Sequence, residues 1–222
     1  MDNKIKNALE ASVGNYATLE NIDATDFLKT LSSAFEGDKA FMEKVSALDA
    51  AFDNHQNFEE LREYSFDLLM INFFAEDVQK LEADYLESAE WEAIEEETID
   101  RGSELLNILL YLKECADDEI EPSLDDFLKE FLLVEEDEFQ DEYTIYEKII
   151  ANQILVESSY QEIANVAETL DEEEEIAELF YPIISFFTEQ NPSKEQLSEF
   201  TKYASNKALY TALYELIINF NK

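Results

Sequence analysis

Carboxylates are the one plentiful group of side chains in this sequence that could do chemistry. The 222 residues include 54 Asp and Glu, but a single histidine, His55, and a single cysteine, Cys115. A di-iron bundle needs paired Glu-x-x-His motifs, zinc needs several His or Cys ligands, and a calcium-binding EF-hand needs a fixed order of Asp and Gly. The sequence contains none of these patterns. We therefore predict no metal ligand, no cofactor and no catalytic residue.

One set of glutamates nevertheless resembles a known metal site. The spacing Glu-Glu-x-x-Glu occurs at Glu59, Glu60 and Glu63 and again at Glu174, Glu175 and Glu178. The first motif, with Glu97 and Asp100 downstream, resembles the magnesium-binding pattern of all-α nucleotide pyrophosphatases of the MazG type. The resemblance implies that acids on neighbouring helices hold Mg²⁺ against the phosphates of a substrate. A magnesium-dependent pyrophosphatase is thus an alternative function.

The net charge of −39 is concentrated in the middle of the chain. Residues 63–193 carry 39 acids and 5 bases, a net charge of −34, whereas residues 1–62 carry −6 and residues 194–222 carry +1. Charge that is focused in this way makes a field that can steer a cationic partner. Nucleic acid and anionic membranes would both be repelled. The charge therefore predicts a basic protein partner.

Acids four residues apart on a helix lie about 6 Å apart along its axis. Glu92, Glu96, Asp100 and Glu104 have this spacing and are predicted to form one unbroken row. Such a row resembles the regular negative charge of a nucleic-acid backbone. A second dense group of acids lies in residues 135–142. The residues that we predict to bind the partner are Glu87, Trp91, Glu92, Glu95, Glu96, Asp100, Glu104, Glu135, Glu136, Asp137 and Glu138.

Trp91 is the only tryptophan and lies inside the first acidic segment. If the inner stripe of its helix passes through Leu86, Ala89 and Ala93, Trp91 points away from the core. An outward tryptophan would be a contact anchor, since tryptophan is enriched in binding hot spots. The alternative is that Trp91 packs under the next helix. Both interpretations stay open from the sequence.

The apolar spacing is helical almost throughout, which predicts an all-α fold, either a multi-helix bundle or a short α-solenoid-like stack of helical hairpins. Three Gly and three Pro are too few for the many turns of a β-rich fold, and 46% apolar residues suffice for a core. Residues 103–115 are apolar on nearly all sides and too short to cross a membrane, which needs about 20 residues. We expect them to form the central helix.

We predict a single domain over residues 1–222, with a possible sub-boundary near residues 100–103. One cysteine cannot form an internal disulfide, which favours the reducing cytoplasm. The N-terminal residues lack the apolar run of a signal peptide. These features predict a cytoplasmic protein.

The sequence thus favours a non-enzymatic, acidic protein-binding module. Its expected target is a basic, nucleic-acid-binding surface of a partner protein, which would make it a DNA- or RNA-mimicking inhibitor. An immunity protein or a chaperone that masks a basic toxin or secreted partner is the first alternative, and the pyrophosphatase is the second. Competition by nucleic acid separates mimicry from masking, and a pyrophosphatase needs carboxylates that converge on one metal.

Overall fold

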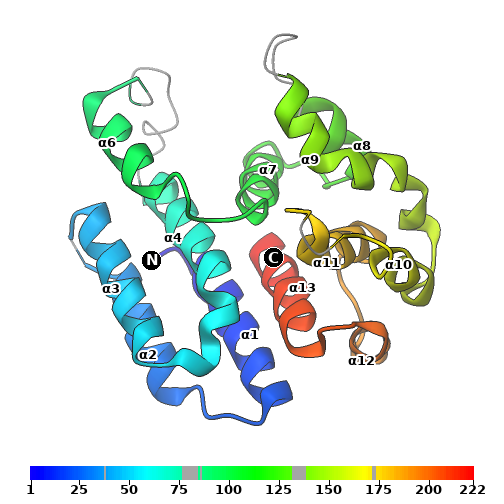
Figure 1. Ribbon diagram of the computed structural model, residues 1–222, viewed down its shortest axis with the longest axis horizontal. Coiled ribbons are helices and arrows are strands. Elements are labelled where there is room, and N and C mark those ends of the chain that lie inside the picture. Colours follow the sequence, from blue (N-terminus) through cyan, green and yellow to red (C-terminus); the bar gives the residue numbers. More distant parts are fainter. Residues whose placement is uncertain (38, 77–84, 86, 132–138, 172–173) are drawn as a thin grey trace.

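The computed structural model describes residues 1–222 except 38, 77–84, 86, 132–138 and 172–173. Within these residues all regular secondary structure is helical, with no strand, so the prediction of an all-α fold is confirmed (Figure 1). The elements are α1 (Asn3–Glu20), α2 (Thr25–Phe35), α3 (Phe41–Asp53), the 3₁₀ helix η1 (Gln56–Leu61), α4 (Arg62–Glu76), α6 (Ala89–Thr98), α7 (Leu105–Asp117), α8 (Leu124–Asp126), the π-helical η3 (Phe127–Phe131), α9 (Phe139–Ala151), the 3₁₀ helix η4 (Gln153–Glu157), α10 (Tyr160–Ala167), α11 (Ala177–Thr188), α12 (Lys194–Tyr203) and α13 (Lys207–Asn221).

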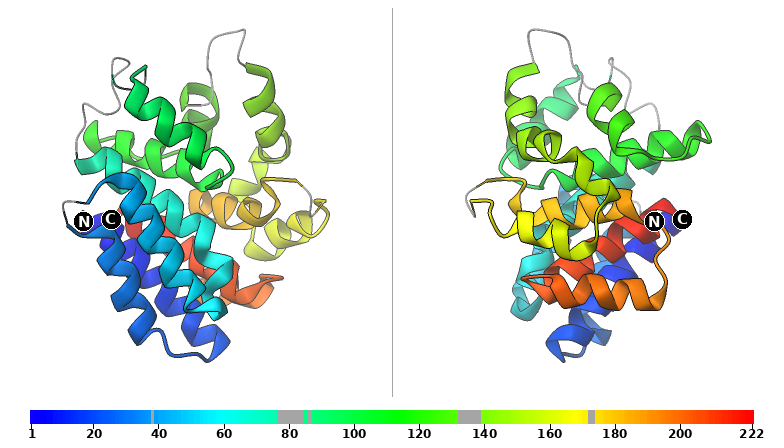
Figure 2. Two further views of the ribbon diagram at one scale, coloured as in Figure 1. Left: turned by 60° about the vertical axis from the view of Figure 1, so that its left-hand side comes forward. Right: turned by 90° about the vertical axis from the view of Figure 1, so that its right-hand side faces the viewer.

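The first and last helices form the centre of the molecule. α1 packs along α13 in the most extensive contact between any two described elements, and the two ends of the chain lie at the same end of this pair (Figure 2). Ten of the 15 residues of α13 are buried. In a solenoid each repeat contacts only its sequence neighbours. The pairing of α1 with α13 therefore makes the fold a bundle.

α7, which includes most of the apolar stretch at residues 103–115, lies beside this central pair. It packs against α4 and α13. Leu105, Ile108, Leu109 and Leu112 are buried, whereas Leu106 and Leu110 are only partly buried. The expectation that this stretch is the central helix is therefore corrected, because α13 takes the more enclosed position.

The remaining helices flank the central pair on two sides. In Figure 1, α2, α3, α4 and α6 lie on one side of α1, and α8 to α12 lie on the other side of α13. α7 lies between the two groups, and the chain runs from α6 through α7 to α8 (Figure 1). Among the described residues, no helix combines the length and the apolar character that a membrane crossing requires.

Candidate partner-binding site

The acidic helix α6 begins at a well-formed cap. The hydroxyl of Ser88 accepts a hydrogen bond from the backbone N–H of Trp91 at 3.2 Å. Glu90 and Glu92 lie in the first turn, where the positive end of the helix dipole favours acids. The local sequence therefore explains both the start of the helix and a few of its acids.

The ring of Trp91 is half-buried and faces inward. Its centroid lies 5.3 Å from that of Phe74 and 6.3 Å from that of Tyr85. The sequence-based idea of an outward-pointing Trp91 is therefore wrong. Trp91 packs inward as in the alternative, and the aromatic residues that it contacts, Phe74 of α4 and Tyr85, precede it in the chain. Because part of the ring remains exposed, a contact between Trp91 and a partner stays a prediction.

The inner stripe of α6 differs from the predicted one. Ala89 and Ala93 are exposed, and Leu86 lies outside the described residues. The buried side instead runs through Trp91 and Ile94. The reason is area, since burying a tryptophan and an isoleucine removes much more apolar surface from water than burying two alanines.

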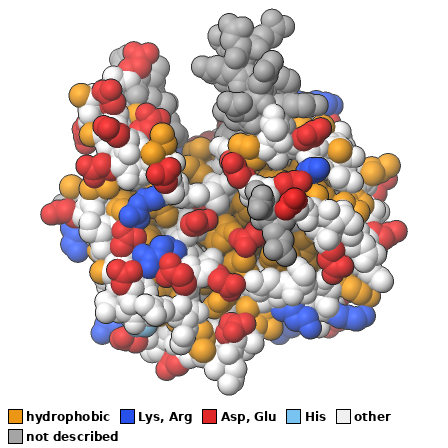
Figure 3. Space-filling model, in the orientation of Figure 1, with side chains coloured by type: hydrophobic (Ala, Val, Ile, Leu, Met, Phe, Trp, Pro, Cys, Tyr) orange, Lys and Arg blue, Asp and Glu red, His pale blue; other side chains and the backbone are white. Residues whose placement is uncertain are grey.

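The other faces of α6 and the turn after it are covered with acids. Between Glu87 and Asp100 the chain contains no Lys or Arg. The exposed acids are Glu87, Glu90, Glu92, Glu95, Glu96, Glu97 and Asp100. These seven residues are called the α6 acidic surface, and Figure 3 shows many red side chains over α6.

The predicted unbroken row of four acids is not present. Glu92 and Glu96 lie one turn apart on α6, but the helix ends at Thr98, so Asp100 belongs to the turn that follows. Glu104 is the residue before α7, is half-buried, and accepts a hydrogen bond from the amide of Asn107 at 3.0 Å. Helical spacing in a sequence produces a row only while the helix continues. Of the predicted binding residues, Glu104 belongs to an internal network.

The second predicted segment, residues 135–142, lies partly outside the described residues, and its last four residues begin α9. Glu135, Glu136, Asp137 and Glu138 lie outside the described residues. Their part in binding stays a prediction.

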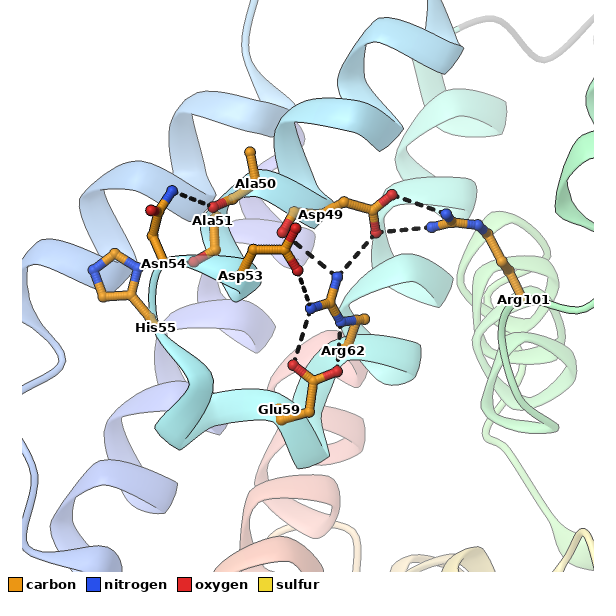
Figure 4. A network of polar contacts seen from close by, with 9 residues as sticks. All are labelled: Asp49, Ala50, Ala51, Asp53, Asn54, His55, Glu59, Arg62 and Arg101. Atoms are coloured by element: carbon orange, nitrogen blue, oxygen red, sulfur yellow. Dashed lines mark hydrogen bonds and ion pairs between the residues drawn. The ribbon is translucent and has the colours of Figure 1, made fainter.

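Two arginines lie beside the α6 acidic surface, and both are bound to other acids (Figure 4). Arg62 donates to both carboxylate oxygens of Glu59, at 2.7 and 2.9 Å, to Asp53 Oδ1 at 2.7 Å and to Asp49 Oδ1 at 3.2 Å. These contacts, the one with Glu59 first, raise the pKa of Arg62 above its ordinary value. The Arg62 cation is therefore already neutralised by its own neighbours.

Arg101 is held in the same network. Its two terminal nitrogens donate to the two oxygens of Asp49 at 2.9 and 2.8 Å. Burial opposes ionisation of Asp49, but the hydrogen bonds and charges of Arg101 and Arg62 outweigh it and lower the pKa of that carboxyl. The network joins α3 and α4 to the turn after α6, and so it positions that turn.

A buried carboxylate anchors the same turn from the other side. Asp67 in α4 is fully buried and accepts hydrogen bonds from the Ser103 backbone N–H, at 3.1 Å, and from the Ser103 hydroxyl, at 2.6 Å. Burial raises the pKa of Asp67 to about 8, although the bonds from Ser103 oppose this shift. Gly102 has φ +89°, and a Cβ there would lie 2.6 Å from Asp67 Oδ1. Only glycine fits this close approach.

These elements enclose a groove of about 580 Å³, called the α6 groove. Its lining residues are Asp49, Asp53, Arg62, Glu63, Phe66, Glu96, Glu97, Ile99, Asp100, Arg101 and Gly102. Six carboxylates and two guanidinium groups give this lining a net charge of −4. Ile99 adds an apolar contact, since its side chain is 75% exposed.

Four carboxylates of the α6 groove form no ion pair with any described Lys or Arg. They are Glu63, Glu96, Glu97 and Asp100. Burial and the neighbouring Glu178 raise the pKa of Glu63. The groove therefore combines uncompensated negative charge with an exposed apolar side chain.

The glutamates of the pyrophosphatase-like motif are divided between different contacts. Glu63, Glu97 and Asp100 line the α6 groove. Glu59 is bound by Arg62, and Glu60 accepts a hydrogen bond from the Tyr16 hydroxyl at 2.7 Å. Within the described part of the chain, no three His, Cys, Asp or Glu side chains lie close enough together to hold a metal ion. The described residues therefore do not assemble the metal site that the resemblance implies.

Sequence reasoning missed the residues that shape the α6 groove. Asp49, Arg62 and Arg101 are far apart in the chain, and no local pattern pairs them. Asp67 did carry a signal, because it is an acid within the apolar run of residues 66–74. A charge in a helix that is otherwise buried indicates a buried polar contact.

Comparisons of this chain with protein-family models, with curated proteins and with solved structures find no significant match.

Proposed function

We propose that this protein is a non-enzymatic binding module that holds a basic surface of a partner protein in the α6 groove. The observation that carries the proposal is the set of four carboxylates, Glu63, Glu96, Glu97 and Asp100, that line one groove and form no ion pair with any described Lys or Arg. Like charges at such proximity destabilise a fold. A Lys- or Arg-bearing partner supplies the compensating charge.

The groove suits long basic side chains in two ways. The aliphatic stem of a lysine or arginine packs against the exposed Ile99, while its cationic head meets Glu96, Glu97 or Asp100. Arg62 and Arg101 do not compete for these acids, because Asp49, Asp53 and Glu59 bind them. The net charge of −34 over residues 63–193 adds long-range attraction.

The proposed partner is a protein whose basic surface otherwise holds nucleic acid. This part of the proposal rests on the density of the exposed acids on α6 and not on their regular spacing, since the helix ends at Thr98. The alternative is an immunity protein or chaperone that masks a basic toxin or secreted partner. Nucleic acid competes with this protein for the partner in the first case and does not compete in the second.

The site is tested by comparing two variants that each lose four acids, one set in the α6 groove and the other set elsewhere. The probe is a fluorescently labelled peptide of ten lysines, and the variant carries Glu63→Gln, Glu96→Gln, Glu97→Gln and Asp100→Asn. Exposed ion pairs contribute up to about 1 kcal/mol each, so the variant should bind the probe about tenfold more weakly. The matched control removes four exposed acids elsewhere, with Glu10→Gln, Glu20→Gln, Asp23→Asn and Glu36→Gln.

The control should retain nearly all of the affinity for the lysine peptide. Equal losses in the two variants would show that total charge governs binding and would remove the α6 groove from the proposal.

A further inference from the structure

A second groove has the opposite charge. It lies between the C-terminal half of α1, α12 and the start of α13 and has a volume of about 590 Å³. Lys194, Lys202 and Lys207 line it, and no Asp or Glu among the described residues does. We call it the lysine groove. In Figure 3, blue side chains gather at the lower right, where Figure 1 places α12.

The lysine groove stands out against the charge of the whole chain. The net charge is −39, and only 15 residues are Lys or Arg, yet three of them line this one groove. Lys194 and Lys207 are exposed and form no ion pair with any described residue. Lys202 donates to the hydroxyl of its neighbour Tyr203 at 3.0 Å. At least two of the three cations are therefore available to a ligand.

The groove also offers apolar contacts. Leu19 at the end of α1 is 41% exposed, and Leu197 on α12 is partly buried. On the groove wall the hydroxyls of Thr201 and Thr211 lie 3.0 Å apart and bond to each other. Three cations around two leucines suit a ligand that carries anionic and apolar groups together.

We propose that the lysine groove binds an acidic segment of a partner protein in which apolar residues lie between the acids. Glutamate or aspartate side chains of the segment pair with Lys194, Lys202 and Lys207, and its apolar side chains contact Leu19 and Leu197. This surface is separate from the α6 groove and does not depend on it, since the two grooves share no residue.

A nucleic acid fits the lysine groove less well. Duplex DNA carries one charge per 1.7 Å or so of its axis, so it would extend past three lysines onto a protein of net charge −39. Its phosphates are charged and make no apolar contact with Leu19 or Leu197. A short acidic protein segment ends within the groove and uses both kinds of contact.

The probe for the test is a fluorescently labelled peptide of three Glu-Leu-Glu-Glu repeats. The full chain with Lys194→Gln, Lys202→Gln and Lys207→Gln should bind it about tenfold more weakly at low salt than the unchanged protein. The matched control, Lys6→Gln with Lys29→Gln and Lys39→Gln, changes the net charge equally at exposed positions outside the groove. It should bind within about twofold of the unchanged protein. All six substituted lysines are exposed, and circular dichroism checks that both variants fold.

A second variant tests the apolar part. Leu19→Ser leaves the charge unchanged and should lower the affinity for the Glu-Leu-Glu-Glu peptide about threefold. A peptide of Glu-Ser-Glu-Glu repeats, which lacks the leucines, should bind the unchanged protein and the Leu19→Ser variant with equal affinity. Failure of the unchanged protein to bind the peptide, or equal losses in the two triple-lysine variants, would overturn the proposal. The proposal would also be overturned if the unchanged protein bound a twelve-nucleotide oligothymidine as tightly as the Glu-Leu-Glu-Glu peptide. If sedimentation shows that the unchanged protein is a dimer and that the groove substitutions make it a monomer, the groove binds a second copy of this chain instead.

Discussion

The carboxylate of Asp49 in α3 accepts hydrogen bonds from both terminal nitrogens of Arg101, 52 residues later in the chain, at 2.9 and 2.8 Å. This fork fixes the turn after α6 to α3 and thereby holds one wall of the α6 groove. Its geometry is bidentate, which gives an arginine–carboxylate pair both strength and a defined orientation.

Removing this fork should destabilise the protein measurably. Asp49→Asn weakens contacts to two arginines, and we expect the free energy of unfolding to fall by about 1–2 kcal/mol, less than for a fully buried pair because Asp49 is partly exposed. Urea denaturation measures it. Asp125→Asn is the control, because Asp125 and Lys129 form an ion pair of which both members are more than half exposed. A loss in the control as large as in Asp49→Asn would contradict the anchoring role.

Two glycines should respond to alanine in opposite directions. At Gly102, φ is +89° and the new Cβ would lie 2.6 Å from Asp67 Oδ1, so Gly102→Ala should lower the free energy of unfolding by about 1–3 kcal/mol. Gly14 lies inside α1, and nothing is within 4 Å of a Cβ placed there. Gly14→Ala should therefore stabilise by about 0.5–1 kcal/mol. Thermal unfolding of the two variants tests both signs, and a stable Gly102→Ala would refute the close approach to Asp67.

Asp67 should make stability fall as the pH rises. Its pKa is about 8 in the folded protein, mainly through burial, and 3.8 is its ordinary value. Between these values the folded protein holds a proton that the unfolded chain has lost. The contribution of Asp67 to stability is therefore fully present below about pH 4 and decreases by about 1.4 kcal/mol per pH unit until about pH 8.

Asp67→Asn should remove this contribution. The variant is expected to lose stability less steeply than the unchanged protein between pH 5 and pH 8 or so, as measured by urea denaturation at each pH. Asp125→Asn, at an exposed position, should keep the original slope. Parallel slopes for Asp67→Asn and the unchanged protein would mean that Asp67 is ionised throughout this range.

The helical fold could be predicted from sequence because apolar spacing reports burial locally. The last helix is the clearest case, where Leu209, Leu213 and Leu216 recur at helical spacing and all three are buried. The spacing could not reveal that α13 packs along α1, since this pairing joins the two ends of the chain. Nor could it tell that α7 would be the less enclosed helix.

The acidic surface was predictable in composition but not in geometry. Glu92 and Glu96 are exposed on α6 as expected. Glu104 does not continue the row of Glu92 and Glu96, because α6 ends at Thr98 and the chain turns at Gly102. Long-range contacts such as those of Arg62 and Arg101 with Asp49 decide which acids of the groove are neutralised. Such contacts leave no periodic pattern in a sequence.

Added salt should raise the melting temperature. The net charge of −34 in residues 63–193 implies repulsion between exposed acids, and raising NaCl from about 0.01 M to about 0.1 M shortens the Debye length from about 30 Å to about 10 Å. Differential scanning calorimetry measures the shift. A melting temperature that falls over this range would mean that ion pairs such as Arg62 with Asp53, rather than repulsion, dominate the salt dependence.

The central claim is that a basic partner binds in the α6 groove, and amide chemical-shift mapping by NMR tests it most directly. On titration with the ten-lysine peptide, we expect the largest shifts at Glu92, Glu96, Glu97, Asp100 and Arg101, and shifts that shrink as salt is added. Acids of the N-terminal part, such as Glu10 and Glu20, should shift little. Shifts spread evenly over the exposed acids, or centred on a surface outside the groove, would contradict the claim.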